Sequence, residues 1–104
     1  MVSRGDVCWV ETPEDGRRPM LILTRSEAIP VLYDVIAVIV TSTIRGIPTE
    51  VRLNGDDGMP EECAVNLDNI RRVPRDFLGK PITTLSGPRM HEVCQALAIA
   101  TGCN

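Results

Sequence analysis

The 104-residue sequence is poor in the residues on which many enzymes and binding proteins depend. One tryptophan, one tyrosine and one phenylalanine are too few for an aromatic-lined peptide groove. The only histidine, His91, lies off the apolar stripe of the predicted C-terminal helix, so we expect it to be solvated and not a general base. No P-loop, GxGxxG or GxSxG motif occurs, which leaves nucleotide-triphosphate chemistry and acyl transfer without support.

Paired cysteines are also absent. Cys8, Cys63, Cys94 and Cys103 are widely dispersed, whereas a zinc site needs ligands at short, characteristic spacings. We therefore predict no metal, no cofactor and no disulfide. Cys8 and Cys94 lie among apolar residues, and we expect them to be small buried hydrophobic side chains.

Long apolar runs are missing too. None approaches the roughly 18 residues that span a bilayer, and the N-terminus resembles no secretory signal, so we expect a cytoplasmic protein with no membrane association. The length predicts a single domain over residues 1–104. A net charge of −3 argues mildly against broad nucleic-acid binding, yet ten of the eleven basic residues are arginine, which grips phosphates bidentately. A GC-rich coding sequence would produce the same excess.

Short apolar runs bounded by turn residues indicate strands, and only the C-terminus carries a helical pattern. The predicted strands cover residues 6–11, 19–24, 34–41, 49–54 and 63–73, the last as one strand or two. A polar loop over 12–18, an exposed acidic turn over 55–62 and a helical turn over 74–78 connect them. The helix starts near Ser86 and stops at Gly102. Its predicted apolar stripe consists of Met90, Val93, Cys94 and Leu97. The pattern predicts a mainly β (α+β) fold, a small, partly open β-barrel with a C-terminal α-helix.

The most informative segment spans residues 37–51, where a β-branched strand ends on Thr41, Ser42, Thr43 and Arg45. Three hydroxyls and a fixed positive charge suit an anionic ligand such as a phosphodiester. From this segment alone, a β-hairpin with a polar turn is the simpler interpretation.

Arg18 is the second candidate, because Pro19 biases its backbone toward an extended conformation at the start of a strand. If the strands pair as expected, Arg18 and Thr41 approach each other at one barrel edge. An arginine there can stabilise charge that develops on a phosphate. The alternative is a surface arginine next to a loop. The carboxylates of Asp56, Asp57, Glu61 and Glu62 are predicted to form a solvated run. Trp9 and Tyr33 are expected in the core or a dimer interface.

Four segments together resemble the MazF/PemK family of toxin endoribonucleases. They are RGDVCWVE, GRRPMLIL, VIVTSTIRGIPTEVRL and the segment from LDNIRRV to ALAIATG, in the family's order and over nearly the whole chain. The resemblance implies an SH3-like β-barrel that forms a homodimer and cuts single-stranded RNA without a metal. In that chemistry the 2′-hydroxyl attacks the adjacent phosphate and leaves 2′,3′-cyclic phosphate and 5′-hydroxyl ends.

The resemblance places the catalytic arginine at Arg18 and the catalytic threonine at Thr41. Ser42 and Thr43 would help to position RNA. The predicted RNA-binding set is completed by Arg17, Arg45, Glu14 and Asp15. Arginine is a poor base because it stays protonated, so the general base is left open. The loop before Arg18 is shorter than in many members and lacks their glutamate-bearing stretch, so no cleavage sequence is predicted.

The family further implies a toxin of a toxin–antitoxin pair that inhibits translation and growth. A cognate, acidic MazE-like antitoxin would cover it and fold on binding. One alternative is a gyrase-poisoning toxin of the same fold without nuclease activity, which has no need of the Arg18 and Thr41 pair. Another is a non-catalytic SH3-like interaction module, which the scarcity of aromatic residues disfavours.

Overall fold

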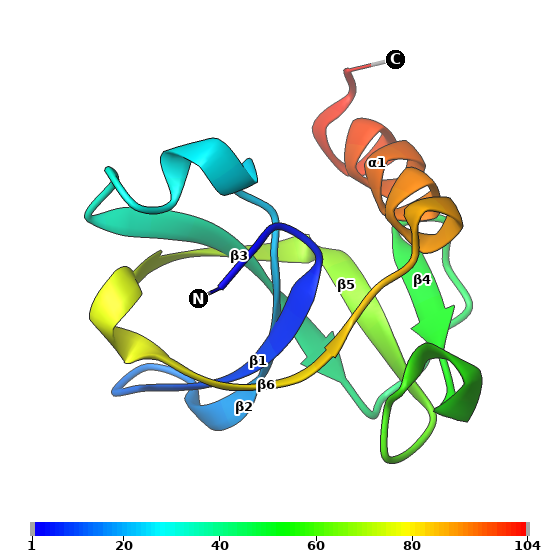
Figure 1. Ribbon diagram of the computed structural model, residues 1–104. Coiled ribbons are helices and arrows are strands. Elements are labelled where there is room, and N and C mark those ends of the chain that lie inside the picture. Colours follow the sequence, from blue (N-terminus) through cyan, green and yellow to red (C-terminus); the bar gives the residue numbers. More distant parts are fainter. Residues whose placement is uncertain (1, 104) are drawn as a thin grey trace.

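The computed structural model describes residues 2–103 and shows a strongly bent antiparallel sheet with a helix beside it (Figure 1). The strands are β1 (Asp6–Thr12), β2 (Gly16–Ile22), β3 (Asp34–Thr41), β4 (Glu50–Leu53), β5 (Cys63–Pro74) and β6 (Leu78–Thr84), and the helix is α1 (Gly87–Thr101). The order across the sheet is β4-β5-β3-β2-β1-β6. The prediction of a mainly β, small barrel-like fold with a C-terminal helix is confirmed.

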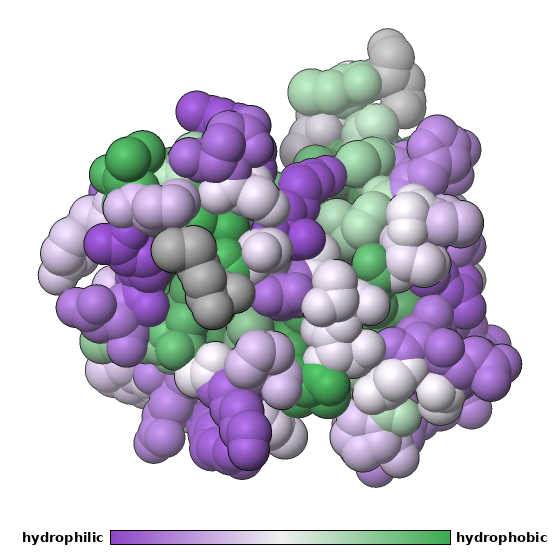
Figure 2. Space-filling model, viewed as in Figure 1, coloured by the Kyte–Doolittle hydropathy of each residue, from purple (hydrophilic) through white to green (hydrophobic). Residues whose placement is uncertain are grey.

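Both faces of the central strands are apolar, which explains why they read as continuous hydrophobic runs. In β2, Leu21 packs into the core cluster beneath α1, whereas Met20 and Ile22 on the opposite face join a second core cluster. The second cluster is enclosed by the curl of the sheet and by Ile29, which follows the short 3-10 helix η1 (Ser26–Ala28). In the view of Figure 2, hydrophilic residues cover most of the periphery, and apolar residues show within the hollow of the barrel and along α1.

Helix α1 begins and ends where its capping residues predict. The Ser86 side chain accepts a hydrogen bond from the Arg89 backbone N–H, and Gly102 adopts the left-handed conformation (φ 71°) that closes the last turn. The predicted apolar stripe is partly wrong. Val93 and Ala96 are the buried residues, whereas Cys94 is exposed beside the guanidinium of Arg4. The small Ala96 side chain allows close approach to the sheet and rotates the buried face away from Cys94.

The largest differences from the predicted strands are at the start of β2 and at β6. The polar loop expected over 12–18 is only a tight turn, because Arg17 and Arg18 pair with Glu11 and Val10 as part of β2. The sequence also does not predict β6 (Leu78–Thr84), since GKP at its start lacks the composition of a strand. Within residues 2–103 this strand pairs with β1 alone, so β6 and β4 are the outer strands of the open barrel.

The acidic turn over 55–62 lies beside both outer strands, and most of its residues are exposed, as predicted. Asp57 and Met59 are the exceptions, because they contact the rest of the fold. The turn begins with the 3-10 helix η2 (Gly55–Asp57), and Met59 after it is buried. The hydroxyl of Thr83 in β6 donates to the Asp57 carbonyl at 2.8 Å. The Asp57 carboxylate accepts hydrogen bonds from the Arg89 guanidinium, at 2.8 and 3.3 Å. This turn is therefore tied to both β6 and α1.

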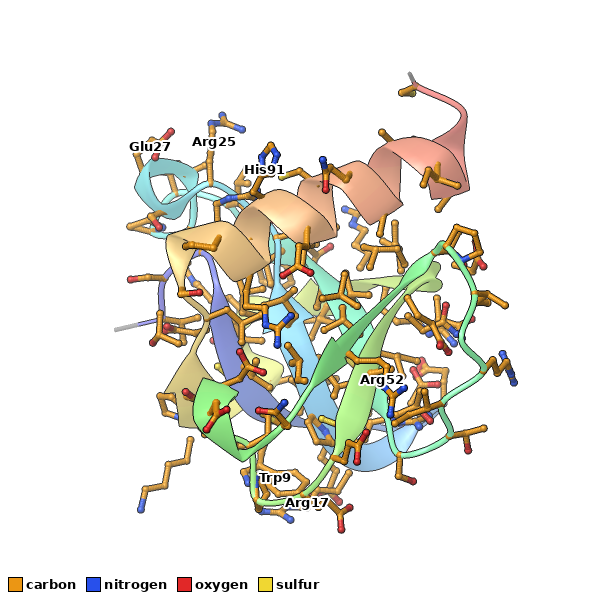
Figure 3. The ribbon with its side chains drawn as sticks, turned by 90° about the vertical axis from the view of Figure 1, so that its right-hand side faces the viewer. Trp9, Arg17, Arg25, Glu27, Arg52 and His91 are labelled. Atoms are coloured by element: carbon orange, nitrogen blue, oxygen red, sulfur yellow. The ribbon has the colours of Figure 1, made fainter. Side chains whose placement is uncertain are left out.

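The remaining predictions concern one helical turn and three single residues. The helical turn expected over 74–78 is the 3-10 helix η3 (Arg75–Phe77). His91 is exposed on α1, as predicted (Figure 3). Tyr33 is 74% exposed and is therefore not a core residue, and Trp9 is half-buried. Within residues 2–103, no helix has the length and apolar character needed to cross a membrane.

Candidate functional site

The two residues singled out from the sequence, Arg18 and Thr41, line one pocket of about 190 Å³, together with Ser42. The pocket lies where β2 begins, where β3 ends and where the acidic turn enters β5. We refer to it as the Arg18–Thr41 pocket. The prediction that the two residues approach each other is confirmed, although they lie more than twenty residues apart in the chain. They meet at one end of the neighbouring strands β2 and β3, and not at β4 or β6, the outer strands of the sheet.

Arg18 is held by the strand and not by a loop. Its backbone pairs with Val10 across the β1–β2 ladder, and Pro19 fixes the residue that follows. The side chain is half-buried. Within residues 2–103, no carboxylate lies within ion-pair distance of its guanidinium. The pocket therefore presents a fixed positive charge with free donors, the arrangement that binds a phosphate in bidentate fashion.

Thr41 is oriented by its own chain. It pairs with Ala64 at the end of β3, and its Oγ1 accepts a hydrogen bond from the Thr43 backbone N–H at 3.1 Å. A hydroxyl that accepts through its oxygen keeps its proton for donation. The local turn thus holds the Thr41 hydroxyl as a donor beside the pocket. Thr43 contributes to the site through its backbone, while its side chain is exposed outside the pocket.

Arg45 does not line the pocket. Its backbone N–H and that of Gly46 donate to the Glu50 carboxylate at 3.0 Å, which fixes the turn that leads into β4. Gly46 has a positive φ of 68°, as this tight turn requires. The Arg45 side chain is exposed beyond the pocket.

Arg17 does not line the pocket itself but stacks on Trp9, which does. Its guanidinium carbon lies 4.1 Å from the ring centroid of Trp9, and the two side chains lie together in Figure 3. They occupy diagonal positions across the β1–β2 ladder, where long side chains contact each other. Trp9 itself lines the pocket, so Arg17 supports one wall and adds a second positive charge next to it.

The structure does not bring Glu14 and Asp15 to this pocket. Both lie in the tight turn between β1 and β2, beside a separate pocket of about 200 Å³. The Asp15 carboxylate is paired with Arg71 at 3.0 Å, and its side chain is only 13% exposed. The pairing leaves the Asp15 carboxylate little freedom to contact a ligand.

One charged residue that lines the pocket, Glu61, was not among the predicted site residues. It is exposed, as predicted for the acidic run, and it borders the pocket from the solvent side. Cys63 also lines the pocket, and burial together with the carboxylates of Glu61, Asp57 and Glu62 raises the pKa of its thiol. A signal was present in the sequence. Met59 is an apolar residue inside an acidic turn, and its burial is what folds the turn onto the barrel.

A larger cleft of about 760 Å³ lies between β4 and α1, and we refer to it as the β4–α1 cleft. Its charges are already paired within the chain. Arg52 pairs with Glu62, and Arg89 pairs with Asp57 and Glu92. Figure 3 shows Arg52 on this side of the molecule, away from Trp9 and Arg17. Despite its size, the cleft lacks the unpaired cation that a phosphate requires.

Within residues 2–103, no group of three or more histidine, cysteine or acidic side chains is arranged to hold a metal ion. The chemistry available in the Arg18–Thr41 pocket is that of a guanidinium, two hydroxyls, one carboxylate and the protonated Cys63 thiol. Such a set can bind a phosphodiester, stabilise added negative charge on it and accept one proton.

Comparison with known proteins identifies relatives over the whole chain. Residues 3–101 match the family described as the PemK-like, MazF-like toxin of type II toxin–antitoxin systems. The chain is 41% identical over 103 residues to the probable endoribonuclease MazF2 of Mycobacterium tuberculosis H37Rv, covering 98% of this chain and 100% of the relative. It is equally identical to the probable endoribonuclease MazF5 of the same strain, with 98% and 94% coverage. Among solved structures, a mycobacterial endoribonuclease in complex with its cognate antitoxin superposes with a TM-score of 0.90 at 32% identity, covering 100% of this chain and 98% of that one.

Proposed function

Because the chain belongs to the family of PemK-like, MazF-like toxins of type II toxin–antitoxin systems, we propose that it is an endoribonuclease toxin that cleaves single-stranded RNA in the Arg18–Thr41 pocket. One observation carries the assignment of the site. Arg18, without an ion-pair partner in residues 2–103, and the oriented Thr41 hydroxyl line the same pocket. A phosphodiester in that pocket meets both a positive charge and a hydrogen-bond donor.

The reaction is an attack of the RNA 2′-hydroxyl on the adjacent phosphate, which gives 2′,3′-cyclic phosphate and 5′-hydroxyl ends. Negative charge accumulates on the phosphate oxygens in the transition state, and Arg18 and Thr41 stabilise it in a half-buried site. Ser42 lines the same pocket and contacts the bound phosphate or ribose. Arg17, beside the Trp9 ring, and Arg45 with Thr43 extend the contact along the RNA strand.

Cleavage of cellular RNA inhibits translation and growth. The protein acts in the cytoplasm, where RNA substrates are found. A cognate MazE-like antitoxin holds it inactive, in line with the mycobacterial relative that was solved with its antitoxin. A homodimer is also proposed. Val31 and Tyr33, which are 81% and 74% exposed, form an apolar surface suited to a protein partner.

Incubation of the purified protein with a defined single-stranded RNA in EDTA tests the function. We expect cleavage at a small number of positions, with cyclic phosphate at the 3′ ends and hydroxyl groups at the 5′ ends. The alternative, a gyrase poison of the same fold, predicts intact RNA at micromolar protein together with inhibited supercoiling. That outcome would refute the proposed function.

A further inference from the structure

The proposed cleavage requires a group that takes the proton of the attacking 2′-hydroxyl, and most of the pocket cannot supply one. Arg18 stays protonated at any working pH, and the Thr41 hydroxyl is a donor. The only histidine, His91, is exposed on α1 and does not line the pocket. Burial raises the pKa of the Cys63 thiol, so it stays protonated at neutral pH. One ionisable acceptor remains among the residues that line the pocket, the carboxylate of Glu61.

We propose that Glu61 is the general base of RNA cleavage in the Arg18–Thr41 pocket, an inference that rests on the proposed endoribonuclease function. The assignment is geometric. Glu61 is exposed at the mouth of the pocket and lines it together with the half-buried Arg18 and Thr41, the two groups that would hold the scissile phosphate. The attacking 2′-hydroxyl belongs to the ribose whose 3′ oxygen carries the scissile phosphate. A phosphate bound by Arg18 and Thr41 therefore brings this hydroxyl close to the pocket that Glu61 lines.

The turn that carries Glu61 is anchored at three points, so the carboxylate is not on a freely moving loop. The Asp57 carboxylate binds the Arg89 guanidinium of α1 and caps the Asn54 backbone N–H at 3.0 Å. Thr83 of β6 donates to the Asp57 carbonyl. Met59, two residues before Glu61, is 6% exposed and packs in the core. Two of these anchors come from elements outside the turn, which limits the range of positions of Glu61.

Glu61 and Glu62 line different cavities, so changing each in turn separates a catalytic role from a general effect of acidity. Glu62 pairs with Arg52 and lines the β4–α1 cleft. Glu61 has no ion-pair partner in residues 2–103, so its carboxylate is available to a ligand. The charged or titratable groups that line the pocket around it are Arg18 from β2 and Cys63 from β5.

The proton and electron balance of the step needs only water besides the RNA. The Glu61 carboxylate takes the 2′-hydroxyl proton while the 2′ oxygen forms its bond to phosphorus. The bond from phosphorus to the 5′ oxygen then breaks, and the departing oxygen takes a proton from water. Glu61 afterwards returns its proton to the solvent. Arg18 remains protonated throughout and stabilises the charge on the non-bridging oxygens.

Single-turnover cleavage by Glu61→Gln and by the matched control Glu62→Gln tests the assignment. Gln keeps the size of the side chain and removes its basicity. Because positioned general bases contribute about 100-fold to 10,000-fold, we expect Glu61→Gln to lower the cleavage rate constant by about 100-fold or more and Glu62→Gln to change it less than about threefold. Affinity for a 2′-O-methyl RNA, which cannot react, should stay within about threefold of wild type in both variants, because no phosphate contact is lost.

Two further readouts separate a base from a merely structural residue. The wild-type rate should fall on the acid side as one carboxylate becomes protonated, and this limb should disappear in Glu61→Gln. Added formate should restore part of the rate of Glu61→Ala but not that of Arg18→Ala. If the wild type cleaves RNA and Glu61→Gln keeps its rate and its acid limb, this inference is wrong while the proposed function stands. If the wild type leaves RNA intact, the proposed function fails first.

Discussion

The two clefts on either side of the acidic turn differ in what the chain does with their charges. In the β4–α1 cleft, Arg52 and Arg89 are each paired with carboxylates of the same chain. In the Arg18–Thr41 pocket, Arg18 has no such partner in residues 2–103, and the pocket has only a quarter of the volume of the cleft. The smaller pocket is thus the better candidate for an anion site, because free donors matter more than space.

The comparison also shows that one structural device serves both sites. Arg89 lines the β4–α1 cleft, and its pair with Asp57 anchors the turn that carries Glu61. Hydrogen bonds from the Arg89 guanidinium lower the pKa of the Asp57 carboxyl, and the same contact raises the pKa of Arg89. In the β4–α1 cleft the paired arginines stabilise the fold, whereas in the Arg18–Thr41 pocket the unpaired Arg18 is available to a ligand. This difference can be tested by changing each side separately.

The largest effect is expected from removal of the unpaired arginine. Arg18→Ala should lower the rate of RNA cleavage by about 100-fold to 1,000-fold, since it removes the charge that stabilises the transition state. Arg52→Ala in the other cleft removes an arginine of the same kind and should leave the rate within about twofold. Single-turnover kinetics on one RNA substrate compares the two. An equal loss of cleavage rate in both variants would show that catalysis does not depend on which cavity the arginine lines.

Gly58→Ala should disrupt the turn between the clefts. Gly58 has a φ of 87°, and a Cβ there would lie 2.3 Å from the Thr83 hydroxyl oxygen. Steric overlap and left-handed strain together predict a loss of about 3 kcal/mol in the free energy of unfolding. Urea denaturation measures it. Gly55→Ala is the control, because a Cβ at Gly55 meets nothing within 4 Å and should cost less than about 1 kcal/mol.

Asp57→Asn should weaken the same turn by loss of charge alone. Breaking hydrogen bonds between charged groups predicts a loss of about 2 kcal/mol at neutral pH. Because the folded-state pKa of Asp57 lies below its ordinary value of 3.8, this contribution is present above 3.8 and is lost as the pH falls through the folded-state pKa. Unfolding curves of the wild type and the variant should therefore converge in acid. Asp56→Asn, one residue away and exposed, should show neither effect; if it matches Asp57→Asn, the pair with Arg89 is not the cause.

The smallest effect belongs to the exposed pair in the β4–α1 cleft. The side chains of Arg52 and Glu62 are 62% and 57% exposed, and such pairs contribute less than about 1 kcal/mol. Glu62→Gln should accordingly leave the melting temperature almost unchanged by differential scanning calorimetry. A loss as large as that of Asp57→Asn would mean that this cleft is structurally coupled to the fold more strongly than its exposure indicates.

The sequence predicts the fold well where periodicity and capping are local. Ser86 and Gly102 fix the helix ends, and the β-branched residues before Thr41 predict β3. It fails where tertiary contacts decide. No local signal marks β6, because its pairing with β1 and not its composition makes it a strand. Cys94 fits the helical stripe by spacing alone, but close packing at Ala96 sets the buried face.

The candidate site shows the same division. Arg18 and Thr41 can be singled out from local chemistry and from the resemblance, and strand pairing then brings them together. Glu61 cannot be singled out in this way, since its placement depends on contacts of Asp57 with Arg89 and Thr83, which are 32 and 26 residues away. Glu14 and Asp15 illustrate the opposite error. They precede Arg18 closely in sequence, yet the β1–β2 turn carries them away from the pocket.

The central claim is that RNA binds at the Arg18–Thr41 pocket and not in the β4–α1 cleft. Backbone amide chemical shifts measured by NMR during titration with a 2′-O-methyl RNA test it most directly. We predict the largest shifts at Arg18, at residues 41–43 and at residues 59–63, with little change in β4 and α1. Shifts confined to β4 and α1, with Arg18 and Thr41 unaffected, would contradict the account.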